Sequence, residues 1–318
     1  MADSAGPAYL ATPYFMRGTG LGNRLFQWAH CRVYCDRQDV PMVAPRWWRP
    51  ALGHLVRGTV GPERFFSQIA LVGLFQRGSA DLPWFAGLWP RMKGQIIRES
   101  MALPVVSAAP GSLLLFDSLQ CSFHSLNAYQ PSLTSALLDI TRPAIRRRLR
   151  ALQEPMIGIN VRCGKDFRSP PEEGAGSEWV GWLQQTPISW FRETLLTVRG
   201  RAGYAVPALV ISDGDRCQLE ELLALPAFSL LRPTNALLDL WMLARCRLLL
   251  GTGSSTFSAW AAFLGQQTAM TAPGKPMTNW GLEPQRGQLI GVFNPRKPDD
   301  SVIEAMLGSL QTAPGFLA

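Results

Sequence analysis

A short apolar segment in the middle of the chain leads into side chains that can bind an anion. Residues 156–161, Met-Ile-Gly-Ile-Asn-Val, are mostly apolar and partly β-branched, which is typical of a buried strand in a parallel sheet. Arg162 and Lys165 follow at its carboxyl end, where open α/β sheets bind their ligands. Because a buried unpaired charge is costly, the Arg162 guanidinium needs an anion, and its planar fork fits phosphate oxygens.

A structural ion pair explains the same guanidinium equally well. Asp166 and Glu172 follow in the sequence and are its candidate partners. The same acidic residues, together with Glu173, are also candidates for a general base, which must lie within hydrogen-bond reach of the hydroxyl that it deprotonates. This segment alone does not choose between a phosphate site and an ion pair.

A second polar cluster lies near the end of the chain. Residues 251–258, Gly-Thr-Gly-Ser-Ser-Thr-Phe-Ser, separate a strand predicted at 247–250 from a helix predicted at 259–264, with Gly265 as its C-cap. The two glycines allow the backbone to approach a ligand, and hydroxyls and helix-start N–H groups can donate to a phosphate. Ordinary capping explains one or two hydroxyls only. The predicted contacts are Ser254, Ser255, Thr256 and Phe257.

The amino-terminal segment has the layout of a phosphate-binding turn. A strand is expected at 8–16, a glycine-rich turn at 17–23 and a helix at 24–36, so that backbone amides and the positive helix end point at one ligand. Asn23 stands where a dinucleotide fingerprint requires its third glycine, which disfavours a nicotinamide oxidoreductase. The candidate ligand contacts in this turn are Gly20, Gly22 and Asn23.

Acidic residues follow another predicted strand, at 206–211. The sequence Ser212-Asp213-Gly214-Asp215 places two carboxylates where a ribose, a base edge or a metal ion would bind. A helix begins near Cys217, which makes Asp215 a natural N-cap and disfavours a metal-binding pair. Asp213 is therefore the predicted ligand contact.

The remaining pattern completes two series of strands and helices. We expect further strands at 40–45 and 113–116, and helices at 132–152, 189–199, 236–244 and 300–310. Residues 46–110 show no clear helical or strand periodicity of apolar residues, and we interpret them as an irregular region packed on the first sheet. Alternatively, the tryptophans of this region line a sugar subsite by ring stacking: Trp47, Trp48, Trp84 and Trp89.

Composition narrows the class of partner. The chain has 318 residues, enough for two domains, a formal charge of +8 and a pI near 9.5, which favours an anionic partner. The arginine block at 146–150 is interpreted as a solvated helix face and not as a nucleic-acid site, since no aromatic residues interleave it. Peripheral contact with an anionic membrane stays open.

Cysteine usage and hydrophobicity indicate the compartment. Six cysteines are scattered without a Cys-x-x-Cys pair and only three histidines occur, which argues against a zinc site or a disulfide framework. The apolar runs are much shorter than the roughly 20 residues of a membrane span, and the first residues do not resemble a signal peptide. The expectation is a cytoplasmic protein with reduced thiols and no transmembrane segment.

Three segments resemble motifs of the α-1,2-fucosyltransferases, glycosyltransferase family 11 and its relatives. Residues 20–27, Gly-Leu-Gly-Asn-Arg-Leu-Phe-Gln, are similar to the family's Gly-Leu-Gly-Asn-Gln-Leu-Phe-Gln. Residues 160–167 resemble its His-x-Arg-Arg-Gly-Asp motif, and residues 254–260 its Asn-Ser-Ser-Phe-Ser-Trp-Trp segment. Ile211-Ser212-Asp213 falls where the family has Phe-Ser-Asp. The matches run through residues 20–264 in the family's order.

The resemblance implies a fold, a reaction and roles for the residues. It implies an α/β GT-B-like fold, with Rossmann-type domains at 1–150 and 151–318 facing a central nucleotide-sugar cleft. The first domain would face the acceptor and the second would bind GDP, with the last helix a candidate to pack back on the first. The implied reaction is an inverting, metal-independent transfer of fucose from GDP-fucose to a glycan hydroxyl, without a cofactor. Arg162 would hold the donor diphosphate, Asn23 would face the donor, Asp213 would approach the nucleoside and 254–257 the phosphates.

Two departures from the motif keep a second interpretation open. Asn160 replaces the motif's histidine and Cys163 its second arginine, while Lys165 is inserted before Asp166 and would restore a positive charge without a bidentate fork. The alternative is therefore a catalytically weak or inactive protein of the same fold that binds a nucleotide or a glycan.

Overall fold

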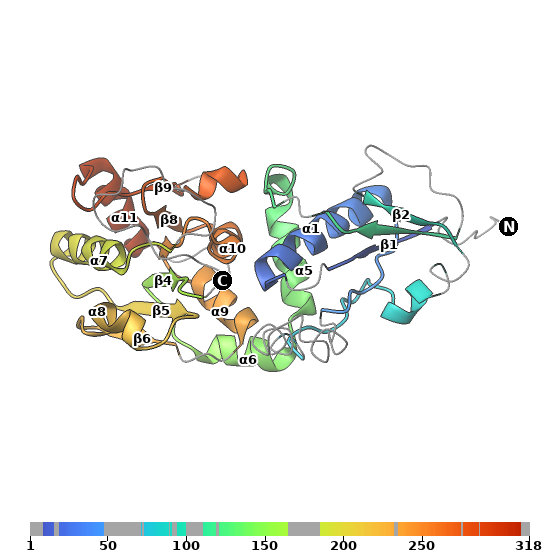
Figure 1. The fold of residues 1–318 in the computed structure, drawn as a ribbon, viewed down its shortest axis with the longest axis horizontal. Helices are drawn as coiled ribbons and strands as arrows, with labels where there is room; N and C mark the ends of the chain where they lie inside the picture. The colour runs from blue at the N-terminus through green and yellow to red at the C-terminus, as the bar shows by residue number, and fades with distance from the viewer. Residues whose placement is uncertain are drawn as a thin grey trace. The chain divides into compact units, whose positions relative to one another are not determined.

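The chain forms two compact α/β units. The computed structural model describes residues 9–15, 19–47, 71, 73–88, 90, 94–99, 111–118, 121–164, 185–231, 235–274, 276–285 and 287–312. The units comprise Met1–Arg147 and Arg148–Ala318, and the sequence-based boundary lies between residues 150 and 151. Figure 1 shows a sheet with helices in each unit.

The first unit is built on a parallel sheet of three strands. They are β1 (Tyr9–Pro13), β2 (Ile96–Arg98) and β3 (Ser112–Phe116), in the order β1-β3-β2. All five positions of the central β3 are buried, as expected for a strand that is covered on both faces. Helix α1 (Leu21–Gln38) follows β1 and packs on β1 and β3, burying Leu25, Phe26 and Trp28.

The strand predicted at 40–45 does not form. Met42 and Val43 make only isolated parallel bridges, to Ala11 and to Leu82. Pro41 and Pro45 flank them, and a proline has no N–H to donate to a sheet ladder. The apolar character of this segment reflects burial of Met42 and Val43 and not a continuous strand.

The single helix predicted at 132–152 is two helices. Helix α5 (Gln130–Ile140) ends before Thr141, and α6 (Pro143–Ala151) begins at a proline. Proline suits the first helical position but disfavours helical geometry in the residue before it, so Pro143 ends one helix and starts the next. Thr141 caps the break, because its Oγ1 donates to the Leu137 carbonyl at 2.7 Å. Most of the α6 arginine block is exposed, while Ile145 and Leu149 are buried.

The second unit is a doubly wound sheet of six parallel strands. They are β4 (Ile157–Val161), β5 (Ala208–Ser212), β6 (Phe228–Leu230), β7 (Leu248–Gly251), β8 (Thr268–Thr271) and β9 (Ile290–Val292). Their order is β6-β5-β4-β7-β8-β9. The first strand therefore lies inside the sheet and the chain changes direction between β4 and β7, which is the strand order of nucleotide-binding Rossmann sheets.

Helices cover both faces of this sheet. Ile157, Ile159 and Val161 share one core with α7 (Ile188–Ala202), α8 (Glu220–Leu223) and α11 (Asp300–Gln311). On the other face of β4, Gly158 lies close to Leu243 of α9 (Ala236–Ala244), and Asn160 bonds to Ser258 of α10 (Thr256–Gly265). Helices α9 and α10 pack against each other (Figure 1). Burial on both faces explains why these strands are continuous apolar runs in the sequence.

The last helix packs within its own unit. Helix α11 contacts α7, β7 and β8, and Ile303, Met306 and Leu310 belong to the core of the second unit. Asp299 begins the helix by accepting a hydrogen bond from Ser301 N at 2.8 Å. The apolar face of α11 is therefore used inside the second unit.

Gly265 is not the C-cap that the sequence predicted. It is the last residue of α10, and the left-handed position after it is taken by Gln266, with φ 53°. A Cβ on Gly265 would lie 2.0 Å from the carbonyl oxygen of Ala244 at the end of α9. The glycine is required for close helix contact and not for its backbone conformation.

The other described helices are short 3₁₀ turns: η1 (Trp84–Gly87), η3 (Asn127–Tyr129), η4 (Cys217–Leu219) and η5 (Met277–Trp280). Among the helices that the structure describes, none has the length and hydrophobicity needed to cross a bilayer.

Candidate anion-binding site

The candidate site lies where β4 and β7 end side by side. Arg162 follows β4, and Thr252 follows the neighbouring β7. The backbone N–H of Arg162 donates to Thr252 Oγ1 at 3.3 Å, and that hydroxyl donates to the carbonyl of Asn160 at 3.0 Å. The two turns are thus joined at the topological switch point of the sheet, the place where open α/β sheets bind ligands.

The guanidinium of Arg162 has an acidic partner on the other neighbouring strand. Its Nε lies 3.1 Å from Oδ2 of Asp213, which follows β5, and the two side chains are 27% and 33% exposed. The other carboxylate oxygen, Oδ1, accepts a hydrogen bond from the backbone N–H of Cys163 at 2.8 Å. Asp213 therefore holds the Arg162 turn, and both side chains stay accessible to a ligand.

This geometry revises the predicted partners of Arg162. The sequence offered Asp166 and Glu172, which lie outside the described residues together with Lys165, so their roles stay predictions. The carboxylate of Asp213 contacts Arg162 and Cys163 and is one-third exposed, so its predicted contact with a nucleoside stays a prediction. Asp213 is positioned to orient the guanidinium.

Asn160 points into the protein. The residue is only 2% exposed. Its Oδ1 accepts a hydrogen bond from Ser258 Oγ at 2.7 Å, and its Nδ2 donates one to the Ile211 carbonyl at 3.4 Å. One amide thus connects β4, β5 and α10. The predicted ligand contact at Asn160 is replaced by a positioning role, because both ends of its amide are used internally.

The hydroxyl cluster after β7 divides into buried and accessible members. Ser255 is the N-cap of α10, and its Oγ accepts from Ser258 N at 3.4 Å. Thr252 and Ser255 are almost fully buried, and Ser254 is 8% exposed, whereas Thr256 and Phe257 in the first helical turn are partly exposed. The first N–H groups of a helix have no intrahelical acceptors, so this turn is the part of the cluster whose N–H groups can donate to an anion.

Close packing leaves no space for a side chain at Gly251. A Cβ there would lie 2.3 Å from Met277 Cε and 3.0 Å from Ser258 Cβ. The carbonyl of Gly253 accepts a hydrogen bond from Trp280 Nε1 at 3.0 Å. The turn is therefore held against η5 on one side and α10 on the other.

The turn after β5 contains residues that sequence reasoning missed. Gly214 N donates to Ser212 Oγ at 2.9 Å, and a Cβ on Gly214 would lie 2.8 Å from Cys163 Cβ. Asp215 Oδ1 accepts from Gln218 N at 2.9 Å while Gln218 Oε1 accepts from Asp215 N at 3.0 Å, which is the reciprocal bonding of a capping box. Arg216, one residue after the predicted Asp215, is the N-cap position of η4. The position of Gly214 at a strand end, beside the candidate Asp213, was the available signal.

The site carries a neutral thiol where the resembling motif has an arginine. Burial raises the pKa of Cys163, and the negative charge of Asp213 acts in the same direction. The thiol is therefore protonated at neutral pH and adds no positive charge. In the part of the chain that the structure describes, no group of three or more His, Cys, Asp or Glu side chains is arranged to hold a metal ion.

The glycine turn of the first unit lies at the start of α1. Gly20 is the N-cap, Gly22 is buried, and the Oδ1 of the half-buried Asn23 lies 3.8 Å from Cys121 Sγ. Arg24, at the position of the motif's glutamine, is buried and donates to the carbonyls of Thr19 and Trp47. This arginine secures the turn from inside the first unit.

The predicted tryptophan subsite is only partly supported. Trp47 is 6% exposed, so its ring is not available for stacking on a sugar, whereas Trp84 is 45% exposed. Trp48 and Trp89 lie outside the described residues.

Comparison with known proteins identifies the fold. No protein-family model and no curated protein matches the sequence. A crystal structure of the fucosyltransferase NodZ from Bradyrhizobium is similar, with a TM-score of 0.50 and 16% identity over 81% of this chain and 93% of that chain. The crystal structure of the POFUT1 apo-form has a TM-score of 0.48 and 13% identity, over 85% of this chain and 99% of that chain. NodZ α-1,6-fucosyltransferase co-crystallised with GDP has a TM-score of 0.47 and 15% identity, over 81% of this chain and 93% of that chain. The chain has the α/β GT-B-like fold with parallel sheets that the NodZ fucosyltransferase has.

Proposed function

We propose that the protein is a glycosyltransferase that moves fucose from GDP-fucose to a hydroxyl of a glycan, by an inverting reaction that needs no metal. The observation that carries this proposal is the guanidinium of Arg162 at the switch point of a Rossmann sheet, held by Asp213 in a turn whose backbone is bonded to Thr252, in the loop before α10. The sequence motifs and the NodZ-like fold support the same enzyme class.

In this mechanism Arg162 stabilises the leaving group. Breaking the bond between the sugar and the diphosphate leaves negative charge on the phosphate oxygens, so fixed cations and N–H groups there lower the barrier. The guanidinium of Arg162 and the backbone N–H groups around Thr256 and Phe257 would donate hydrogen bonds to these oxygens, with Lys165 as a further cation. A preorganised arginine costs little reorganisation at the moment of reaction, which is what the contacts of Asp213 and Thr252 provide.

The acceptor hydroxyl must lose a proton as the new glycosidic bond forms. In an inverting reaction a general base takes this proton from the face opposite the leaving group. Asp166 and Glu172 remain the proposed candidates. The expected cleft between the domains, with Gly20, Gly22 and Asn23 facing the donor, stays a prediction.

Replacement of Arg162 tests the proposal. Loss of a charge-assisted contact of about 1.5–3 kcal/mol should weaken GDP binding by the chain with Arg162→Ala by roughly 10–100-fold and remove most turnover. The matched control is Arg201→Ala, because Arg201 is an exposed arginine that pairs with Asp300 at the surface. Calorimetry with GDP and a transfer assay with GDP-fucose give the two readouts.

A thermal-shift panel of GDP, UDP and CMP defines the donor class, since a ligand that binds only the native state raises the melting temperature. Stabilisation by GDP and not by the other two is expected. Unchanged GDP affinity in the Arg162→Ala chain contradicts the proposed site. GDP binding without hydrolysis or transfer would instead support the catalytically inactive binding protein, which the departures at Asn160 and Cys163 leave open.

A further inference from the structure

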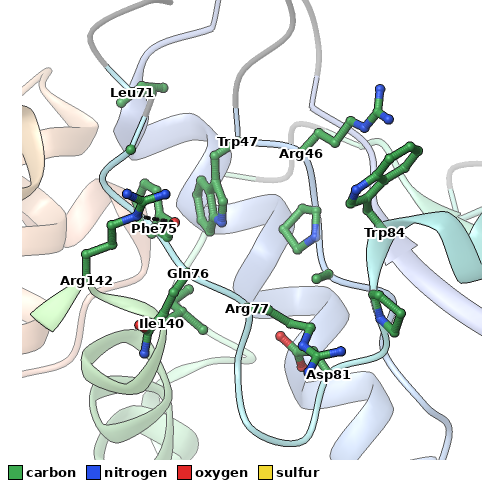
Figure 2. A pocket seen from close by; sticks show the side chains of 14 residues that line it. Arg46, Trp47, Leu71, Phe75, Gln76, Arg77, Asp81, Trp84, Ile140 and Arg142 are labelled. Atoms are coloured by element: carbon green, nitrogen blue, oxygen red, sulfur yellow. Dashed lines mark hydrogen bonds between the residues drawn. The ribbon is translucent and has the colours of Figure 1, made fainter.

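The first unit contains a pocket of about 680 Å³ that the proposed donor site does not use. It lies between residues 44–47, the segment 71–84, Ile140 at the end of α5, and Arg142. Pockets that bind small molecules typically have about 300–1,000 Å³. Figure 2 shows Arg46 and Trp84 on one side of Trp47, and Phe75 and Arg142 on the other.

The aromatic residues form a rigid wall and one accessible platform. The rings of Trp47 and Phe75 are stacked, with centroids 3.7 Å apart and an interplanar angle of 13°, and both residues are buried. Trp84 is 45% exposed, although the guanidinium carbon of Arg46 lies 3.4 Å from the centre of its ring. Part of the indole is thus open to a ligand, and the stacked guanidinium is held with its N–H edge available.

The pocket has an excess of positive charge. Arg46, Arg77 and Arg142 line it and are exposed, and in the described part of the chain none of the three forms an ion pair. Among the described residues that line the pocket, Asp81 is the only acidic one. Its carboxylate is 2% exposed and pairs with Arg32 at 3.0 Å, so it does not neutralise the three guanidinium groups.

The combination of features selects a chemical class. An exposed indole packs against the C–H face of a sugar ring, whereas guanidinium forks bind a carboxylate, sulfate or phosphate group in bidentate geometry. The Arg142 side chain is already oriented, because its Nε donates to the Phe75 carbonyl at 3.4 Å. A neutral sugar would use the indole and offer no anionic group to the three arginines.

We propose that this pocket binds an acidic saccharide, one that carries a carboxylate, sulfate or phosphate group. This proposal is independent of the proposed transfer reaction, because it rests on the arginines and the indole of the first unit alone.

Calorimetry on the full chain with four defined saccharides tests the pocket. Tetragalacturonate offers carboxylates, a heparin-derived tetrasaccharide sulfates and carboxylates, mannose 6-phosphate a phosphate, and chitotetraose is neutral. At least one acidic saccharide should bind at least tenfold more tightly than chitotetraose. Arg46→Ala and Arg77→Ala should each weaken that binding about tenfold, and Arg46→Lys should not restore it, since an ammonium lacks the fork.

Arg37→Ala is the matched control, because Arg37 is exposed at the end of α1 and does not line the pocket. Equal binding of chitotetraose, unchanged binding in both arginine variants, or an equal loss in the Arg37→Ala chain would each overturn the proposal. GDP affinity is expected to be unchanged in the pocket variants. Failure of the proposed function would appear separately, as absent GDP binding in the wild-type chain.

Discussion

The carboxylate of Asp213 joins two parts of the Arg162 turn: Oδ2 lies 3.1 Å from the guanidinium Nε of Arg162, and Oδ1 accepts a hydrogen bond from the backbone of Cys163 at 2.8 Å. Residues at the ends of adjacent strands β4 and β5 are thus fixed to each other. Because both side chains remain about one-third exposed or less, the pair orders the arginine without hiding it from a ligand.

Substitution of Asp213 by asparagine should separate orientation from charge. An asparagine can still accept the Cys163 hydrogen bond, but it removes the anionic partner, and a partly exposed ion pair contributes up to about 1 kcal/mol. We expect turnover to fall by up to about fivefold, since a tenfold loss would need about 1.4 kcal/mol, and the rise in KM for the donor should be smaller than that caused by Arg162→Ala.

Asp215→Asn is the control for this prediction, since Asn caps a helix as well as Asp does. It should leave both kinetic parameters unchanged. Donor binding that becomes tighter in the Asp213→Asn chain would show that Asp213 merely neutralises Arg162 and does not position it.

Asn160→Ala should destabilise the second unit. The substitution leaves Ser258 Oγ and the Ile211 carbonyl without their buried partner, and an unsatisfied buried polar group costs about 1–3 kcal/mol. The free energy of unfolding from urea titration should fall by that amount. Asn279→Ala, at an exposed position of η5, should change it by less than about 0.5 kcal/mol. A wild-type unfolding free energy in the Asn160→Ala chain would be incompatible with the internal network.

Glu99 should make stability depend on pH. Burial raises the pKa of this glutamate, which follows β2, to about 7, and the negative charge of Asp117 contributes in the same direction. The folded chain keeps the proton up to about pH 7, whereas an unfolded glutamate releases it near 4.5. Because the folded state binds more protons in this window, its stability should fall as the pH rises from about 4.5 to 7 and stay level above it.

Chemical denaturation at pH 5 and pH 8 measures this contribution. Glu99→Gln should reduce the fall in unfolding free energy between the two pH values by about 1 kcal/mol, a value discounted for the partial exposure of the carboxyl group. Glu304→Gln, on the exposed side of α11, should leave the fall unchanged. The opposite slope, with the wild-type chain more stable at pH 8 because of Glu99, would refute the assignment.

The sequence predicted best those elements whose burial is visible in local pattern. The strands β4, β5 and β7 are continuous apolar runs because helices cover both of their faces, and helix α9 was placed at its observed bounds. The pattern failed at residues 132–152 and 40–45, where apolar spacing continues across positions that proline interrupts. Proline acts through backbone geometry and a missing N–H, which hydrophobic spacing does not register.

For the site, the sequence by itself determined which turns follow which strands, and thus that Arg162, Asp213 and 251–257 lie at strand ends. Only the tertiary structure decided which of these side chains meet. Its strand order places β5 and β7 on either side of β4, so Asp213 became the partner of Arg162 and Thr252 the acceptor of its N–H. The same packing directs the Asn160 amide to Ser258 inside the protein. It also places Met277 and Ser258 so close to Gly251 that a side chain there would collide with them. The physical reason is that an ion pair or hydrogen bond depends on distance in space, and strand order sets that distance between residues far apart in the chain.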